Sequence, residues 1–243
     1  MDIIIFDLRG RFAHFRKFYT NSSSLSYAIP PRTAVMGIVA AILGLPRDSY
    51  YERFSREKMY IAVRKMNSTR NIMQTVNYIK ATDDKSVMLP KEHTQIPFEI
   101  VTGKNGVTYR IYVHNEDKEL MNELMYRCMN RKPYFSPYLG AAPFGCNISF
   151  IARTNGKLLQ DSNYIEISSA ANTSNIMDGG LQIGEEDIML LKEKMPSEIL
   201  NDRVLTKASS YLFDSHGNSL RLKLTCGFYH LNYGKTSENI LFM

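Results

Sequence analysis

The chain has 243 residues, of which 44% are hydrophobic and 22% are charged, and its formal net charge is +6 at pH 7. These values are typical of a folded soluble protein that is long enough to bury a core. The positive excess is local, because residues 1–70 hold 12 Lys and Arg against 5 Asp and Glu, whereas residues 71–243 hold 18 against 19. We therefore expect a polyanionic partner, with nucleic acid favoured over an anionic membrane.

The three cysteines, Cys128, Cys146 and Cys226, are far apart and form no CxxC pair. This pattern argues against a disulfide framework or a zinc knuckle and favours a reducing compartment, so we expect a cytoplasmic protein. The start of the chain, MDIIIFD, contains acids and no cation, which predicts a strand rather than a signal peptide. The longest nearly apolar run, residues 34–45, is too short to span a bilayer.

The first predicted elements flank a basic, aromatic segment. Residues 2–8 predict a buried strand, and residues 31–43 predict a short apolar helix that follows a Pro-Pro pair and ends before Gly44. Between these elements, cations alternate with aromatic rings: Arg9, Arg11, Arg16 and Lys17 with Phe12, Phe15, Phe18 and Tyr19, and with His14 between two rings. Such cations can neutralise phosphates, such rings can stack on unpaired bases, and the free N–H groups at the helix start suit an anion.

A polar hairpin is predicted in the middle of the chain. After a strand at residues 58–66, residues 70–81 and 86–95 read as two weakly alternating strands around a loop tip at 82–85. This segment has few large apolar residues, so we expect it to protrude from the body. Its polar candidates for contacts are Arg70, Gln74, Asn77, Lys80, Lys91, His93 and Gln95.

The remaining elements complete an α+β fold. Strands at 94–101 and 107–114 flank a Gly-Lys-Asn-Gly hairpin turn, a helix follows at 116–129, and a small-residue loop at 137–145 leads into a strand at 147–152. Residues 1–152 thus predict a ferredoxin-like β-α-β-β-α-β palm with an insertion at about 70–95. Residues 153–243 predict a smaller β-rich region with strands at 164–168, 203–213 and 219–231, a polar loop at 169–180 and a short helical piece at 185–194.

Several candidate residues admit two interpretations. One of Phe12 and Phe15 should pack in the core, because alternate residues of an extended segment face opposite ways. Arg32, at the start of the helix, could meet either a phosphate or a nearby carboxylate. The loop with Gly140, Ala141, Phe144 and Gly145 could expose backbone N–H groups to RNA or could simply make a tight crossover.

Several segments together resemble the Cas-five family of CRISPR-associated proteins, which belongs to the RAMP group. The matching segments are GRFAHFRKF (10–18), SYAIPPRTAVMGIVAAILG (26–44), HTQIPFEIV (93–101), TYRIYV (108–113), PYLGAAPFG (137–145) and ENILFM (238–243). They follow the family's order and spacing from end to end, and their style is most similar to the type I-B branch.

The resemblance implies a non-catalytic subunit of Cascade, the RNA-guided antiviral surveillance complex. Such a subunit caps the 5′ handle of the guide RNA, folds a hairpin thumb over the guide, and joins the backbone subunit (Cas-seven) to the large subunit (Cas-eight), so that it meets target DNA only indirectly. It needs no metal, other cofactor or membrane. The candidate RNA-binding residues are Arg9, Arg11, His14, Phe15, Arg16, Lys17, Tyr27, Arg32, Arg70, Gln74, Asn77, Lys80, Lys91, His93, Gln95, Gly140, Ala141, Phe144 and Gly145.

Two other functions stay open at this point. A metal-independent endoribonuclease needs a base and an acid or cation, and His14, His93, His114, Tyr27 and Lys80 are suitable types. The lysine–histidine set that the related type I-C branch uses is not evident, because no Lys adjoins a His. An RNA-independent scaffold would not explain the charge gathered in residues 1–70.

Overall fold

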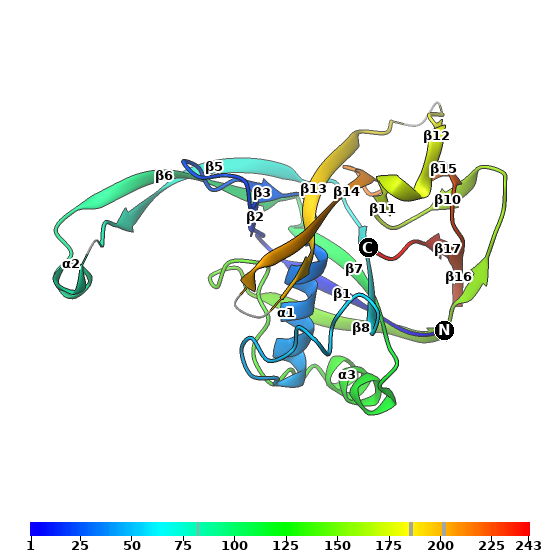
Figure 1. Ribbon diagram of the computed structural model, residues 1–243, viewed down its shortest axis with the longest axis horizontal. Coiled ribbons are helices and arrows are strands. Elements are labelled where there is room, and N and C mark those ends of the chain that lie inside the picture. The colour runs from blue at the N-terminus through cyan, green and yellow to red at the C-terminus, as the bar shows by residue number, and fades with distance from the viewer. Residues whose placement is uncertain (82, 185–186, 201–202) are drawn as a thin grey trace.

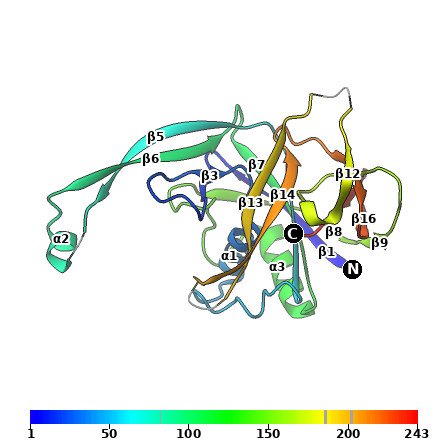
Figure 2. The ribbon, with the colours of Figure 1, turned by 45° about the horizontal axis from the view of Figure 1, so that its top comes forward.

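The computed structural model describes residues 1–81, 83–184, 187–200 and 203–243. It consists of a body, from which a long two-stranded arm projects, and a second group of strands that covers one side of the body (Figures 1 and 2). The helices are α1 (Arg32–Leu43), α2 (Asp84–Met88) and α3 (Lys118–Asn130). The mixed α+β class that the sequence predicts is therefore confirmed. No helix in the described part of the chain is long and apolar enough to cross a membrane.

A four-stranded antiparallel sheet forms the centre of the body. Its strand order is β4-β7-β1-β8, and the strands are β1 (Asp2–Gly10), β4 (Met59–Lys65), β7 (Val107–Asn115) and β8 (Cys146–Asn155). Side chains alternate across the sheet, so Ile4, Phe6 and Leu8 enter the core beside the helices while Ile3 and Ile5 enter a core on the opposite face. This two-sided burial explains why the first strand reads as a continuous apolar run.

Helices α1 and α3 cover one face of this sheet. α1 begins after Pro31 and ends at Gly44, which adopts the left-handed conformation (φ 77°) that a helix end of this type requires. α3 begins at Asp117, whose side chain accepts a hydrogen bond from the backbone N–H of Leu120. The predicted positions of both helices agree with the structure to within two residues, and the order β1, α1, β4, β7, α3, β8 is the predicted one.

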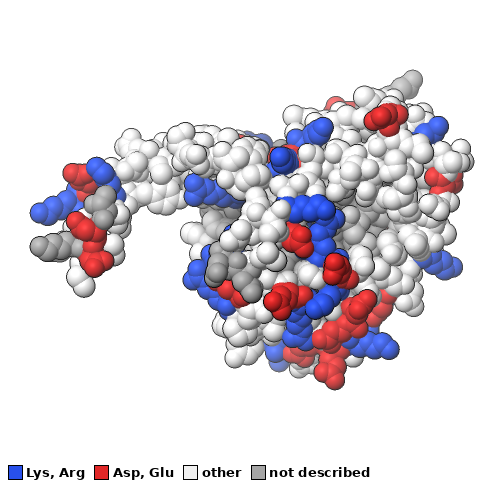
Figure 3. Space-filling view, in the orientation of Figure 1, with Lys and Arg blue, Asp and Glu red and all other residues white. Residues whose placement is uncertain are grey.

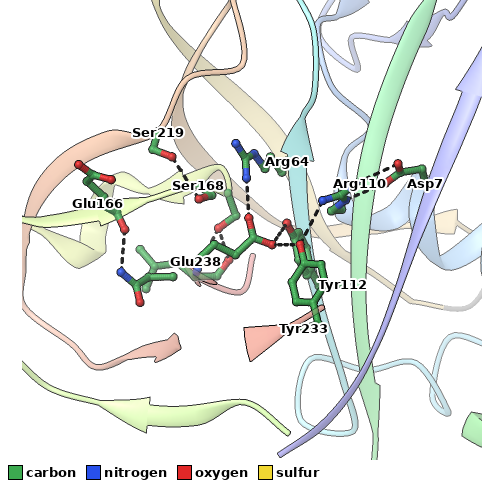
Figure 4. Close-up of polar contacts among 12 residues, drawn as sticks. Asp7, Arg64, Arg110, Tyr112, Glu166, Ser168, Ser219, Tyr233 and Glu238 are labelled. Carbon is green, nitrogen blue, oxygen red and sulfur yellow. Dashed lines mark hydrogen bonds and ion pairs between the residues drawn. The ribbon is translucent and has the colours of Figure 1, made fainter. Parts of the chain in front are cut away.

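A C-terminal hairpin of β16 (Phe228–Tyr233) and β17 (Thr236–Ile240) covers the other face of the sheet. Buried Glu238 fixes this hairpin, because its carboxylate pairs with Arg64 (2.5 Å) and accepts hydrogen bonds from the hydroxyls of Tyr112 (2.7 Å) and Tyr233 (Figure 4). Arg110 extends the network, donating both to the Tyr233 hydroxyl (3.1 Å) and to the buried Asp7 carboxylate (2.8 Å). The face of the sheet opposite the helices is therefore not open to a ligand.

The arm is longer than predicted. Its strands β5 (Arg70–Ile79) and β6 (His93–Thr102) pair along their whole length, from Arg70 opposite Thr102 to Ile79 opposite His93, and α2 lies at the tip. Residues 94–101 thus belong to the arm, and the predicted hairpin between them and 107–114 is wrong, because β7 pairs with β1 and β4 instead. Residue 82, part of the predicted loop tip, lies outside the described residues. The arm is defined below as residues 70–102.

The rest of the chain is mostly β structure. The strands are β9 (Lys157–Leu159), β10 (Ile165–Ile167), β11 (Ala171–Asn172), β12 (Ile176–Gln182), β13 (Leu190–Ile199), β14 (Leu205–Asp214) and β15 (Leu220–Leu224), with a 3-10 turn at Thr173–Asn175. The predicted helical piece at 185–194 is wrong over its described part, because Leu190–Ile199 pairs with β14. The predicted loop at 169–180 contains β11 and much of β12, and the predicted strand at 219–231 is divided between β15 and β16.

Two short strands lie beside the base of the arm. β2 (Phe15–Arg16) pairs with β3 (Ser26–Tyr27), and isolated bridges join Ala13 to Val101 and Ser24 to Phe98. The basic segment is thereby tied to the inner half of β6. This arrangement brings residues 9–12 to the place where the arm leaves the body.

Candidate nucleic-acid interface

An open groove of about 870 Å³ lies where β1 ends and the arm begins. Its lining comes from the end of β1 and the residues after it, the base of the arm, the turn between β6 and β7, and the segment that enters β8. The lining residues are Arg9, Gly10, Arg11, Phe12, Arg70, Ile72, Thr102, Gly103, Lys104, Asn105, Gly106, Ser136, Pro137, Gly145, Cys146 and Asn147. We call this feature the basic groove.

The basic groove contains four cations and no acidic residue. Arg9, Arg11, Arg70 and Lys104 line it from three different elements. The side chain of Arg9 is 59% exposed and lies 3.4 Å from the Asp7 carboxylate, which Arg110 already holds at 2.8 Å. Because no carboxylate faces these cations within the groove, their positive potential is directed at whatever occupies it. A phosphate chain matches this charge.

Close backbone contacts form the floor of the basic groove. Gly10 is paired with Val107 on one side and Cys146 on the other. Gly106 has a positive φ of 79°, and a Cβ at this position would lie 2.3 Å from the Gly10 carbonyl oxygen. Glycine is therefore required there. Phe12 and Ile72 add apolar surface beside the cations, which gives bases as well as phosphates a place to bind.

The loop that precedes β8 makes a tight crossover, which is one of its two predicted interpretations. Gly140 has a φ of 86°, and a Cβ there would lie 2.0 Å from the His14 carbonyl oxygen, so this residue serves packing. Ala141 accepts a hydrogen bond from the Phe144 N–H (2.8 Å), which closes the tight crossover. Phe144 packs against the ring of Phe12 at 5.8 Å. Gly145 lines the basic groove, and nothing lies within 4 Å of the position that its Cβ would take.

Part of the basic segment serves the core instead of a ligand. Phe15 and Tyr27 are buried, and the Tyr27 hydroxyl donates to the Lys194 carbonyl (2.7 Å). Contrary to the prediction, neither side chain is therefore exposed for contact with RNA. Phe12 remains partly exposed, so the expectation that one of Phe12 and Phe15 packs in the core is confirmed. Arg16 is exposed, but it does not line the basic groove, and it donates to the Thr20 carbonyl (3.3 Å).

Lys17 is engaged in an ion pair. Its ammonium lies 2.9 Å from Glu193 of β13 and sits over the Tyr27 ring at 5.6 Å. Burial lowers the pKa of Lys17, but the hydrogen bond and the charge of Glu193 outweigh burial and raise it. Lys17 therefore fastens the basic segment to β13, which the sequence did not indicate.

His14 is a buried structural residue. Its Nδ1 lies 2.7 Å from the Glu99 carbonyl, its Nε2 lies 3.0 Å from the Ser24 hydroxyl, and its ring stacks on Phe98 at 3.8 Å. Burial lowers the pKa of the imidazole, so the neutral ring is favoured. His14 thus joins the basic segment to the arm and does not face a ligand, contrary to the prediction.

Arg32 meets neither of the groups expected for it. It is buried, and its guanidinium donates to the carbonyls of Phe54 (2.9 Å), Met59 (2.7 Å) and Ser197 (3.3 Å). Burial lowers the pKa of this guanidinium to about 10. Arg32 therefore joins the start of α1 to Phe54, to the first residue of β4 and to β13, and the predicted phosphate or carboxylate partner is wrong.

The polar candidates on the arm are exposed, but most lie away from the basic groove. Of these candidates only Arg70 lines it; the others are Gln74, Asn77, Lys80, Lys91, His93 and Gln95. Lys80 pairs with Glu92 at 2.9 Å near the tip. No Lys, Arg, Asp or Glu occurs in residues 71–79 or 93–98, and Figure 3 shows a middle section of the arm without charge.

Sequence reasoning missed several residues of the basic groove. They are Thr102, Lys104, Asn105, Ser136 and Asn147. Lys104 and Asn105 were interpreted only as a turn, because nothing local shows that this turn lies beside Arg11. The feature of the sequence that could have indicated a binding role for Lys104 is its position as a cation in a turn between Gly103 and Gly106.

Comparisons with known proteins show a similarity to one family over part of the chain and a shared fold over most of it. Residues 3–119 match the family model described as CRISPR-associated protein (Cas_Cas5). No curated protein sequence matches the chain. Among solved structures, a CRISPR protein from Archaeoglobus fulgidus has 13% identity and a TM-score of 0.56, with 98% of each chain covered.

Two chains from larger assemblies also have this fold. A chain of a CRISPR RNA-guided surveillance complex has 11% identity and a TM-score of 0.52, over 92% of this chain and 90% of that one. A chain of the type III-B Cmr-β complex, which is bound to cognate target RNA and AMPPnP, has 12% identity and a TM-score of 0.50, over 92% and 86%. Residues 3–119, a little less than half of the chain, are thus similar to the CRISPR-associated Cas-five family, and the chain as a whole shares its fold with these CRISPR proteins.

Proposed function

We propose that this protein binds the 5′ handle of the guide RNA in a type I CRISPR surveillance complex, with type I-B as the branch. The observation that carries the proposal is the basic groove, whose lining includes Arg9, Arg11, Arg70 and Lys104 and no acidic residue. The family match and the fold support the same context. Phosphate contacts of this kind supply sequence-independent affinity, while the glycine backbone lets the chain approach closely.

In this proposal the central sheet with α1 and α3 is a ferredoxin-like palm, and the arm is the thumb. The strand order β4-β7-β1-β8 and the β-α-β-β-α-β element order support the first assignment. The hairpin β16–β17 covers the sheet face on which RNA stacks in RNA-recognition motifs. The RNA therefore follows the ends of the strands, where the basic groove lies, rather than the sheet face.

The arm contacts the guide mainly without ion pairs. Its middle section is uncharged and carries the exposed side chains of Met73, Gln74 and Asn77. Amide groups hydrogen-bond to base edges and sugars, and apolar side chains pack against exposed bases. The arm thus covers the guide, while the groove at its base supplies the charge.

The proposed role includes partners and a location. In the cytoplasm, the protein would join a backbone subunit (Cas-seven) to a large subunit (Cas-eight), and target DNA would be met only through the guide. A protruding arm with exposed Val87, Met88 and Leu89 at its tip supports contacts with another protein or with RNA, because these side chains have no core to enter.

We propose a non-catalytic role. Of the residues considered for cleavage, His14 and Tyr27 are buried, and His114 Nδ1 lies 2.6 Å from the Asp2 carbonyl. Lys80 and His93 lie near the tip of the arm, far along its ladder from the basic groove. No described pair of these residues therefore brackets a phosphodiester in the basic groove, which favours binding over chemistry.

The complex purified from cells that express the whole system tests the function. We expect it to contain short RNA whose 5′ end is protected from nuclease when this protein is present and is exposed when it is depleted. Incubation of the isolated protein with repeat RNA should give no product, with divalent metal or with chelator. A discrete product that disappears in a His93→Ala or His114→Ala variant would instead establish the endoribonuclease.

A further inference from the structure

A second group of exposed aromatic rings surrounds the C-terminal end of α1. Tyr126 is 55% exposed, Tyr134 62%, Phe135 52% and Tyr138 46%. They belong to a stretch, residues 124–160, that contains five Lys and Arg and no Asp or Glu. Aromatic side chains of this size rarely remain exposed together unless they serve binding.

Two of these rings, Tyr134 and Phe135, lie on a segment that is fixed to α1. The N–H of Tyr134 donates to the Ile42 carbonyl and that of Phe135 to the Ala41 carbonyl, both at 3.0 Å, so the segment caps the last turn of α1. A Cβ on Gly44 would lie 2.5 Å from Tyr134 Cγ, which shows that the ring packs closely against the bare glycine backbone. Fixed and exposed rings lose little conformational entropy when they bind a ligand.

A groove of about 640 Å³ runs beside the rings along α1. Small residues of α1 form its floor, and Tyr50, Phe135, Tyr138, Arg47 and Arg203 are on its walls. It shares Pro137 with the basic groove, so the two grooves lie on either side of the loop before β8. We call the rings and this groove the aromatic surface.

The charge of the aromatic surface is positive. Arg47 and Arg203 contact the same carboxylate, Asp48, at 3.3 Å and 3.1 Å, and Tyr51 donates to it at 2.5 Å. One acid therefore faces two guanidinium groups. Arg127 pairs with Glu123 at 2.6 Å and also lies over the Tyr134 ring at 5.5 Å, while Arg131 and Lys132 are exposed nearby.

We propose that the aromatic surface is a second binding site for single-stranded nucleic acid, separate from the basic groove. Unpaired bases lie against Phe135, Tyr138 and Tyr134, and a backbone phosphate is attracted by Arg47 and Arg203. Stacking on aromatic rings next to cations is how proteins bind single strands without reading sequence. The excess of cations favours this ligand over an apolar peptide.

Two strands have this chemistry: the guide RNA where it continues past Pro137, and an unpaired DNA strand near the complex. A 12-nucleotide oligouridylate with a single 5-iodouridine and its deoxy counterpart, each used as a photocrosslinking probe on the full-length protein, distinguish them. We expect crosslinks to Tyr134, Phe135 or Tyr138. A higher crosslinking yield with the RNA probe indicates the guide RNA as the ligand, and a higher yield with the DNA probe indicates the unpaired DNA strand.

Variants make the test quantitative. In a background with Arg11, Arg70 and Lys104 replaced by Ala, Phe135→Ala with Tyr138→Ala should weaken binding of the 12-mer about tenfold or more, because each stacked base contributes substantially. Tyr134→Phe keeps the ring and should bind like the wild type. Crosslinks should persist when Arg11, Arg70 and Lys104 are all replaced by Ala, so failure of the proposed function remains distinguishable from failure of this inference.

Three results would overturn the inference. The first is crosslinking confined to the basic groove. The second is unchanged 12-mer affinity when Phe135→Ala and Tyr138→Ala are added to the folded groove variant, with folding checked by the melting temperature. The third is that this variant keeps its affinity for nucleic acid but no longer copurifies with another subunit, which would make the aromatic surface a protein interface.

Discussion

Removal of three cations from the basic groove should flatten the salt dependence of RNA binding. Arg11, Arg70 and Lys104 come from three different elements, are exposed, and face no acid within the groove. Each contact with a single-strand phosphate contributes about 0.7 to the log–log slope of affinity against salt, so replacing all three by Ala lowers the slope by about 2.1. Between about 50 and 200 mM salt, the wild type should therefore lose about twenty-fold more affinity than the variant.

Fluorescence anisotropy with labelled handle RNA measures this difference directly. A matched control replaces three exposed cations outside the basic groove, Lys157, Arg221 and Lys235, by Ala. The control has the same net charge as the groove variant, so a general effect of charge would flatten both slopes equally. An unchanged slope in the folded groove variant would refute the assignment of phosphates to this groove.

Three further results are expected. Replacing residues 80–92 by an Asn-Gly turn, which joins the paired residues Ile79 and His93, should change the free energy of unfolding by less than about 0.5 kcal/mol, because the tip adds nothing to the core; the stretch of guide RNA that is protected from nuclease should nevertheless become shorter near the arm. Arg32→Lys should lower the free energy of unfolding by about 2–4 kcal/mol in urea titrations, since buried carbonyls lose donors, and leave the salt slope unchanged. Burial lowers the pKa of Lys65 to about 8, below its unfolded value of about 10.4, so the unfolded chain binds more protons between these values. The free energy of unfolding should then rise by up to about 1.4 kcal/mol per unit as the pH increases from about 8 to 10, and Lys65→Met should remove this component; a falling or flat difference would contradict the sign.

Local patterns were sufficient for the body of the protein. The apolar run in β1, the Pro-Pro start and Gly44 end of α1, and the Asp117 cap of α3 are short-range signals that tertiary contacts reinforce. The stretch Leu190–Ile199 shows the opposite case. Its Leu, Lys and Glu residues favour a helix, but pairing with β14 overrides that preference.

The site was predictable in charge but not in detail. The basic groove is made by residues that are far apart in the sequence, because Gly10 pairs with both Val107 and Cys146. Composition located the cations of residues 9–11, yet it could not show that Lys17 pairs with Glu193 or that His14 lies buried against the Glu99 carbonyl. Each of these partners is a long-range contact, which a local pattern does not encode.

The most direct test of the central claim places a crosslinker in the basic groove. Lys104→Cys, in a background with Cys146 and Cys226 replaced by Ser, is labelled with an azidophenacyl group and assembled with guide RNA and the other subunits. We expect crosslinks to nucleotides of the 5′ handle from this position and none from Lys157→Cys, which lies outside the groove. Crosslinks only to nucleotides distant from the 5′ end, or equal crosslinking from the two positions, would contradict the central claim.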